Sequence, residues 1–228
     1  LSIFLKIAEA MMKVEGQLVE MSKGLNMSKQ EAGNLRNELS SAAGESKDIF
    51  VTTSKLIKAQ QSLNQHLGTA AVFSGDVLVK ATQLLEKVKL TTEATAELAG
   101  QSIVAGGAFK DNYENALGTS YEIQRQSGIS VDLREVMEEV GKTTGQIRAQ
   151  LGGSTEAIAE AITKAKTLGM ELKDVASTGK QLLDFESSIS AELEAELLTG
   201  KQLNLEKARL AALTGDYKTL SEEIAKNA

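Results

Sequence analysis

Apolar residues recur through the first hundred residues at alternating spacings of three and four. From Phe4 to Leu98, 28 positions fall in one heptad phase, and 21 of them are apolar. At a hydrophobic content of 42%, chance would give about 12. The pattern is typical of a coiled coil. The predicted oligomer seam comprises Phe4, Ile7, Met11, Val14, Leu18, Met21, Leu25, Leu35, Leu39, Ile49, Leu56, Leu63, Leu84 and Val88.

Two arrangements of residues 1–98 fit this periodicity. One is an extended helix in a homo-oligomer, about 150 Å long at ~1.5 Å per residue, and this is the favoured expectation. The other is a set of helices that folds back on itself. Glycines weaken a continuous helix, and the seam carries polar residues that can set register and copy number. These polar seam residues are Ser28, Ser46, Thr53, Gln60, Ser74, Thr91 and Thr95.

The remainder of the chain divides into two further regions. Residues 99–128 contain five glycines and are predicted to form a hinge or connector. Residues 129–228 show frequent helix start and stop signals and are predicted to form a docking unit of short helices. The expected starts are Ser130, Ser154 or Thr155, Asn204 and Asp216. The expected stops are Gly169, Gly200 and Gly215, and one helix is expected over 172–198. An exposed pair between Glu160 and Lys164 is expected on one helix.

Composition supports an all-α fold and narrows the chemistry. The chain has no proline, which favours long helices, and only 4% aromatic residues. It has no cysteine and a net charge of −6, which disfavours disulfides and sequence-specific nucleic-acid binding. No secretory signal is recognised and no apolar run reaches the ~18 residues of a stable membrane span. The given sequence begins with Leu, within a heptad, so we expect it to be a segment of a longer protein.

Candidate catalytic and metal-binding residues are not found. His66 is a lone histidine, and a zinc site requires further nitrogen or sulfur ligands. The densest acidic cluster, Glu186, Glu192, Glu194 and Glu196, is interpreted as a solvated face beside an apolar stripe of Ile189, Leu193 and Leu197. We therefore expect no enzyme activity, no cofactor and no small-molecule substrate.

One stretch resembles a known protein family. Residues 165–224 are similar to a segment of bacteriophage tail tape measure proteins, most specifically in LLDFESSISAELEAELLTGKQLNLEKARLAALTGD, from Leu182 to Asp216. The phrases that carry the resemblance are residues 182–189 and 199–206. Its marker residues are Leu182, Asp184, Phe185, Glu186, Gly200, Asn204, Glu206 and Gly215.

The resemblance implies a structural virion protein. Tape measure proteins are thought to run as extended helices, in a few identical copies, through the lumen of the tail tube and to set its length. The implied partners are further copies of the chain in a trimer or hexamer, the tail tube, and the tail tip or baseplate hub. The implied location is the virion tail, assembled in the host cytoplasm. No catalytic residue of the family falls in the matched stretch.

Two other classes of protein remain open from the sequence. A signalling coiled coil of the chemoreceptor kind has similar heptads, but it needs a second arm of comparable length. A secretion-system translocator also has such heptads, but it needs membrane-spanning helices. An enzyme needs a nucleophile with its base or a pair of catalytic acids, and neither is recognised here.

Overall fold

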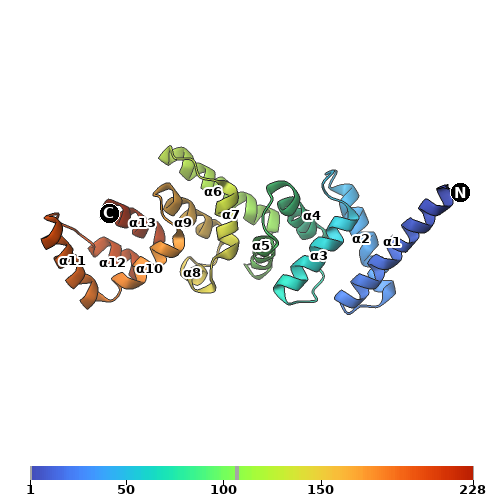
Figure 1. Ribbon diagram of the computed structural model, residues 1–228, viewed down its shortest axis with the longest axis horizontal. Helices are drawn as coiled ribbons and strands as arrows, with labels where there is room; N and C mark the ends of the chain where they lie inside the picture. The colour runs from blue at the N-terminus through green and yellow to red at the C-terminus, as the bar shows by residue number, and fades with distance from the viewer. Residues whose placement is uncertain (1, 106–107, 228) are drawn as a thin grey trace. The chain divides into compact units, whose positions relative to one another are not determined.

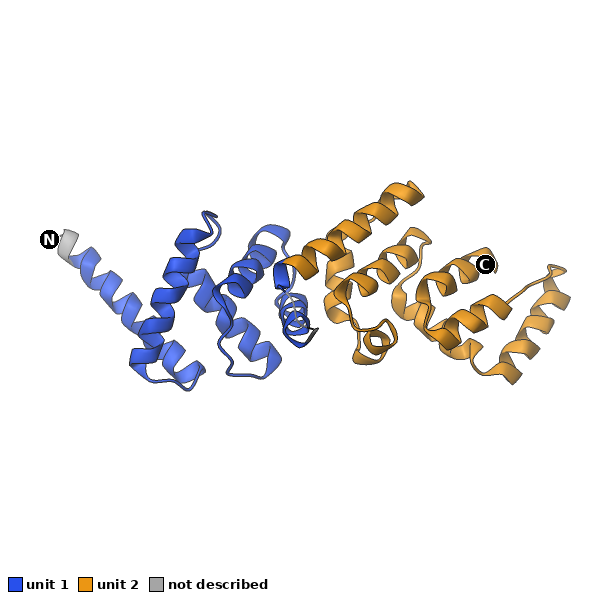
Figure 2. Cartoon of the chain, turned by 180° about the vertical axis from the view of Figure 1, so that it is seen from behind, with its two compact units in different colours: residues 1–110 blue, residues 111–228 orange. Residues whose placement is uncertain are grey.

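The computed structural model describes residues 2–105 and 108–227, with backbone only for residues 2–4 and 105. Every regular element in this part of the chain is a helix (Figure 1). The helices form two compact units, residues 1–110 and 111–228, coloured separately in Figure 2. The expected all-α class is therefore confirmed.

Unit 1 is built around α3 (Thr53–Leu67), which packs against its other α-helices. These are α1 (Ser2–Gly24), α2 (Lys29–Glu45), α4 (Gly75–Gln83) and α5 (Thr92–Ala105), and α4 continues as a short π-helix, η1 (Leu84–Val88). The largest fully buried side chains of this core are Met21, Leu39, Leu56, Leu63, Leu78, Leu84 and Leu98. Short helices that fold back on α3 thus bury the leucines of the heptad pattern.

The favoured expectation of one extended helix over 1–98 is wrong for this structure. The longest helix of unit 1, α1, has 23 residues, and the folded-back alternative is what the structure shows. Half of the predicted seam lies in the core of unit 1: Met21, Leu25, Leu35, Leu39, Leu56, Leu63 and Leu84. Val14, Leu18 and Val88 are half-buried, Ile7, Met11 and Ile49 are exposed, and the side chain of Phe4 lies outside the described residues.

Several polar seam residues are helix caps rather than residues of an oligomer interface. The hydroxyls of Ser28, Ser74 and Thr91 accept hydrogen bonds from backbone N–H groups three residues later, at 3.2, 3.4 and 3.2 Å. At Ser28 the backbone N–H also donates to Glu31, 2.7 Å away, which completes a capping box. An N-cap satisfies donors that a helix end leaves free, so these residues start new helices where a continuous one was expected.

The segment between α3 and α4 is tied to the core by Gln60. Its buried side-chain amide donates to the carbonyl oxygen of Ala71 at 2.7 Å and accepts from the N–H of Phe73 at 3.0 Å. Gly68 ends α3 with a φ of +61°, a conformation that glycine adopts without steric cost. Phe73 is buried as a result, and the seam position Gln60 serves a loop of its own chain.

Asp48 joins the segment between α2 and α3 to α4 and η1. Its carboxylate accepts from the Phe50 N–H at 3.0 Å and the Gln83 amide at 2.9 Å, and it pairs with Lys87 at 2.6 Å. Only 8% of the Asp48 side chain is exposed. The hydrogen bond from Lys87, then that from Phe50, holds the pKa of Asp48 below its ordinary value.

We expect unit 1 to lose stability in acid as Asp48 becomes protonated. Because the pKa of Asp48 is lower in the folded chain than in the unfolded one, its stabilisation is present above the unfolded pKa of about 3.9 and is lost as pH falls through the folded value. Asp48→Asn should lower stability at neutral pH and reduce the acid-dependent loss. Urea unfolding at neutral and acidic pH measures both. The exposed Glu38→Gln is the control, and an unchanged pH profile in Asp48→Asn would contradict the assignment.

Unit 2 is organised around α9 and α10. Its helices are α6 (Phe109–Ser127, which begins just before the unit boundary), α7 (Leu133–Lys142), α8 (Gly145–Gln150), α9 (Thr155–Thr167), α10 (Leu172–Leu182), α11 (Phe185–Thr199), α12 (Glu206–Thr214) and α13 (Tyr217–Asn227). The α9 helix packs against α7 and α13, and α10 packs against α12 and α13. A buried hydrogen bond of 2.9 Å from Thr163 to Ser120 joins α9 to α6.

Most of the helix ends expected in this unit are confirmed. The Ser154 hydroxyl caps α9, and Gly169, Gly200 and Gly215 follow helices with positive φ values. The expected start at Ser130 is wrong, because Asp132 caps α7 by accepting from the Arg134 N–H at 2.8 Å. The single helix expected over 172–198 is two helices, separated at residues 183–184.

The expected exposed pair on α9 is replaced by two bridges to α13. Glu160 pairs with Lys218 at 3.0 Å, and Lys164 pairs with Glu222 at 2.8 Å. The sequence spacing of Glu160 and Lys164 allowed a bond within one helix. In the folded unit α13 lies beside both side chains, so the two ion pairs join α9 to α13.

The predicted connector over 99–128 is largely helical. Residues 99–105 complete α5 and residues 109–127 form α6, which Gly128 ends with a φ of +70°. Gly106 and Gly107 lie outside the described residues. The boundary between the two compact units, after Lys110, falls inside the predicted connector.

Candidate protein-binding surface

The stretch that carries the family resemblance folds as a helical hairpin of α11 and α12. Leu182 is buried at the end of α10, and the exposed Asp184 precedes α11. Gly200, in the left-handed region, ends α11, and the Asn204 side chain accepts from the N–H of Glu206 at 3.3 Å. Gly215 ends α12 and lies so close to the chain at Gln150 that a Cβ would come within 3.2 Å of the Gln150 carbonyl oxygen.

A buried ion pair holds the two helices of the hairpin together. Arg209 of α12 pairs with Glu192 of α11, with only 9% and 13% of their side chains exposed. The Arg209 Nε also donates to the Ser188 hydroxyl at 3.0 Å. The second carboxylate oxygen of Glu192 accepts from the N–H of Leu205 at 3.0 Å. Both ends of the pair are therefore hydrogen-bonded, as buried charges require.

The acidic cluster of α11 has two separate roles. Glu192 and Glu196 hold the hairpin, since Glu196 accepts from the N–H of Leu203 at 2.7 Å. Glu186 and Glu194 are exposed and correspond to the solvated face expected from the sequence. The expectation for Glu192 was wrong because its partner, Arg209, comes from a different helix.

An apolar stripe lies exposed along α11. Phe185, Ile189, Leu193 and Leu197 follow one another every four residues, with exposed fractions of 49%, 45%, 56% and 87%. Residues at this spacing share one helix face. No residue of α11 is buried. Further exposed leucines on the hairpin are Leu198, Leu210 and Leu213. We call Phe185, Ile189, Leu193 and Leu197 the α11 stripe.

A shallow groove of about 410 Å³ runs along the opposite side of α11. Its walls come from α10, α11 and the segment before α12, including Leu182, Ala191, Ala195, Leu203 and Leu205. Small side chains on this side of α11 leave it loosely packed against α10. The hairpin thus exposes apolar surface on more than one side, which is typical of a protein-binding element.

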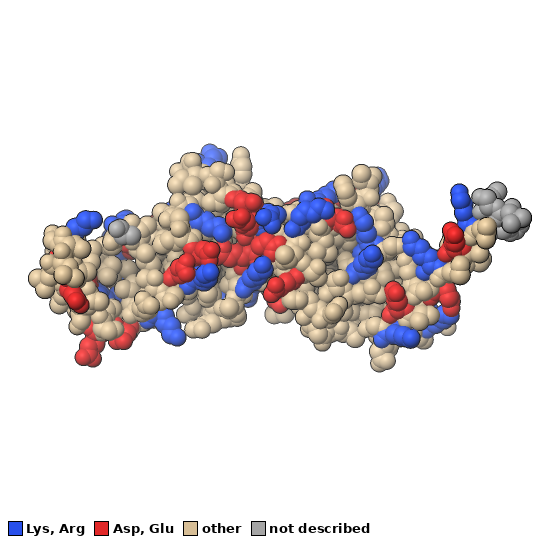
Figure 3. Space-filling model, viewed as in Figure 1, with Lys and Arg blue, Asp and Glu red and all other residues tan. Residues whose placement is uncertain are grey.

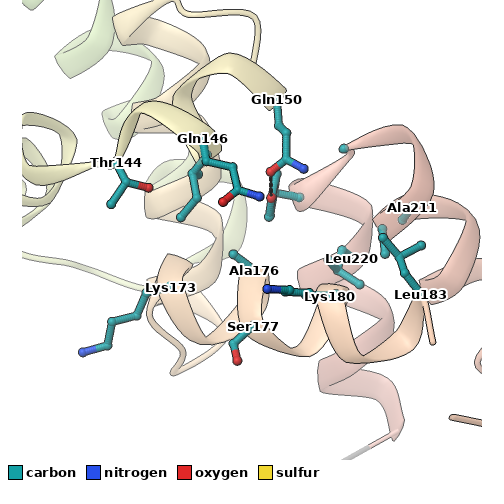
Figure 4. A pocket seen from close by; sticks show the side chains of 15 residues that line it. Thr144, Gln146, Gln150, Lys173, Ala176, Ser177, Lys180, Leu183, Ala211 and Leu220 are labelled. Atoms are coloured by element: carbon teal, nitrogen blue, oxygen red, sulfur yellow. Dashed lines mark hydrogen bonds between the residues drawn. The ribbon is translucent and has the colours of Figure 1, made fainter. Parts of the chain in front are cut away.

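A separate cleft of about 350 Å³ lies among α8, α10, α12 and α13 (Figure 4). Ala176, Ala211 and Leu220 contribute apolar lining, and Gln146 and Lys180 add polar groups. The phenol of Tyr217 donates a hydrogen bond to the side-chain oxygen of Gln150, and both residues line the cleft. Lys173 extends away from the other labelled side chains and pairs with Glu171 at 2.7 Å.

The groups that line this cleft suit binding better than acid–base chemistry. Burial raises the pKa of Tyr217, so the phenol stays protonated at neutral pH and serves as a hydrogen-bond donor. Among the described residues that line the cleft there is no carboxylate and no histidine, the groups most often used to move protons. The cleft combines the amides of Gln146 and Gln150 and the ammonium of Lys180 with small apolar residues. Such a lining can bind a side chain or a short segment of another protein.

The part of the chain that the structure describes offers neither a metal site nor a membrane span. No group of three or more histidine, cysteine or acidic side chains in that part could hold a metal ion. The lone His66 lies at the surface of α3, 3.6 Å from Glu97. Within the same residues, no helix combines the length and the apolar character that crossing a bilayer requires.

Charged side chains are interspersed over the molecular face in Figure 3. On this face several acidic side chains gather near the middle of the view, basic side chains lie around them without an extended basic patch, and the chain as a whole is acidic. A surface that follows a phosphate backbone instead requires clustered lysine and arginine.

Comparison with protein-family models, with curated proteins and with solved structures gives no match to this chain. The candidate surface is therefore defined by the geometry of the hairpin.

The sequence predicted one helix over 172–198, and it did not indicate how α11 and α12 are held together. Every marker residue of the resemblance lies in this hairpin or at its ends. Arg209 was not singled out, although a lone arginine in an otherwise apolar stretch of α12 opposite an acidic helix was a usable signal. The exposure of the α11 stripe could not be derived from periodicity, because a stripe of the same spacing is equally suited to a core.

Proposed function

We propose that this chain is a segment of a bacteriophage tail tape measure protein, a structural virion component that sets tail length. In this proposal several copies lie in the lumen of the tail tube and contact the tube and the tail tip or hub. The observation that carries it is the coincidence of the family-like phrase, residues 182–216, with the hairpin that exposes the α11 stripe. The phrase therefore marks a surface for protein contacts.

The heptad phase supports a second, extended conformation of residues 1–98. A folded-back bundle needs apolar spacing within each helix, but it does not need one phase to continue through the segments between helices. The phase nevertheless places Leu25, Ile49 and Ala70 in three of the segments between these helices, although its other positions in such segments are polar: Ser28, Ser46, Ser74 and Thr91. Ile49 lies in such a segment and is 86% exposed in the folded unit. In an extended coiled coil this seam position would be covered.

We propose that the extended state is the one that acts as a ruler in the tail. A helix advances ~1.5 Å per residue, so a chain of joined helices converts residue number into distance. The chain has no proline to prevent the helices of unit 1 from joining. Copies that pair along the seam would replace the contacts that α1 to α5 make with one another in the folded unit.

Deletion of whole heptads from the parent gene tests the ruler. Removal of residues 54–67 keeps the phase and should shorten the tail by about 21 Å. Electron microscopy of purified phage particles measures the length. Duplication of the same residues is the matched control and should lengthen the tail by the same amount. Tails of unchanged length in both variants would contradict the proposal.

A further inference from the structure

The turns between the helices of unit 1 recur at equal intervals. Four described residues of this unit have a left-handed backbone, with φ between +50° and +63°, and each lies in a turn that separates two helices. They are Asn26, Lys47, Gly68 and Lys89, so each is 21 residues from the next. Each also directly follows a position of the heptad phase, and 21 residues make three whole heptads. The turns therefore keep the register of the seam.

Two of these turns use a residue that is poorly suited to them. A left-handed backbone is unfavourable for residues other than glycine and, to a lesser degree, asparagine. Lys47 and Lys89 adopt it with φ values of +52° and +63°, although lysine is among the better helix formers. In the described part of unit 2, by contrast, every residue with a positive φ is a glycine. Among the described residues, this backbone strain is therefore confined to the turns of unit 1.

The turn at Lys89 follows a second departure from α-helical geometry. The five residues before it form η1, whose hydrogen bonds have the π-helical pattern. π-helices are rare and occur mostly as single turns within an α-helix. The N–H of Lys89 donates to the carbonyl oxygen of Leu84, and the N–H of Leu90 donates to the same oxygen at 3.1 Å. A continuous α-helix through this region would remove both the π-turn and the left-handed residue.

We propose that unit 1 is a conformational switch, in which strained turns at Lys47 and Lys89 weaken the folded state relative to a continuous helix. Straightening these turns relieves the left-handed backbone. The spacing of three heptads keeps the seam in one phase through each joined turn. The inference rests on the extended state of the proposed function, and it names the residues that set the balance between this state and the folded one.

A pair of spin labels across the turns at Gly68 and Lys89 reports the switch in the whole chain. The chain has no cysteine, so His66→Cys/Glu97→Cys gives two unique labelling sites. The side chains of His66 and Glu97 lie 3.6 Å apart in the folded unit, and they would be about 46 Å apart along one continuous helix. Electron paramagnetic resonance distances, measured as trifluoroethanol is added to favour helix, give the ratio of extended to folded molecules. The longer distance should appear during this titration.

Turn variants should shift this ratio in opposite directions. Lys89→Gly relieves the left-handed turn and should lower the ratio of extended to folded molecules about 5–30-fold at a fixed alcohol concentration. Gly68→Ala places a Cβ on a backbone with a φ of +61° and should raise the ratio by a similar factor. Lys58→Gly is the matched control. Residue 58 lies within α3 and is helical in both states, so this substitution destabilises both equally and leaves the ratio unchanged.

Two results would overturn the switch. Labels that never reach the longer distance would show that unit 1 is a fixed array of helices. A ratio that Lys89→Gly changes no more than Lys58→Gly does would show that the strained turn does not set the balance. If either result came with normal tail shortening on heptad deletion, the proposed function would stand without the switch. Tails of unchanged length together with a unit that opens as expected would contradict the ruler alone.

Discussion

Leu63→Ala should destabilise unit 1 by about 3 kcal/mol, because Leu63 is completely buried on the central helix α3. Removing its methyl groups loses their transfer free energy and leaves a cavity that neighbours such as Leu56 fill only in part. Urea unfolding of the whole chain at neutral pH measures the loss as a lower midpoint of the transition that reports unit 1.

Ile49→Ala is the matched control for Leu63→Ala. Both residues occupy the same heptad phase, but Ile49 is 86% exposed and its truncation should change stability by less than about 0.5 kcal/mol. If the isolated chain used the whole seam for a coiled-coil oligomer, the two substitutions would weaken it comparably. An equal loss in both variants would therefore contradict the folded-back arrangement.

Arg209→Met should destabilise the hairpin by about 3–5 kcal/mol, because it leaves the carboxylate of Glu192 buried without its ionic partner. The methionine is close to arginine in length, so the expected loss comes from the uncompensated charge rather than from a large void. The N–H of Leu205 donates a hydrogen bond to Glu192, so hydrogen exchange at this amide reports the loss of stability locally. Protection of this amide should fall with that of α11 and α12.

A double variant separates charge from packing at this pair. Replacing Glu192 as well, in Arg209→Met/Glu192→Leu, removes the stranded carboxylate and should recover part of the stability. Arg134→Met, at an exposed position on α7, is the control and should have little effect. Stability of Arg209→Met within about 1 kcal/mol of the wild type would show that the pair does not hold the hairpin.

The prediction of the helices succeeded where the signal was local. Ser154 and the glycines at 169, 200 and 215 ended or began helices as expected, because caps and left-handed turns involve only neighbouring backbone groups. The same local chemistry was misread at Ser28, Ser74 and Thr91. Their positions coincided with the heptad phase, so they were interpreted as polar seam residues although each caps a new helix.

Side-chain partners were predictable only in part. The spacing of Glu160 and Lys164 indicated a pair within α9, but each found a closer partner on α13. Glu192 was expected to be solvated, and its partner came from α12. Sequence spacing identifies neighbours on one helix, whereas these partners depend on how the chain folds back after several turns.

The sequence by itself determined that this protein is all-α and where most helices of unit 2 end. Only the tertiary structure decided that half of the seam residues are buried within unit 1 and that the α11 stripe stays exposed. The physical reason is that an apolar stripe specifies only that a helix face is to be buried. Helices of the same chain cover Leu63. Leu193 carries the same kind of stripe, yet it is 56% exposed in unit 2.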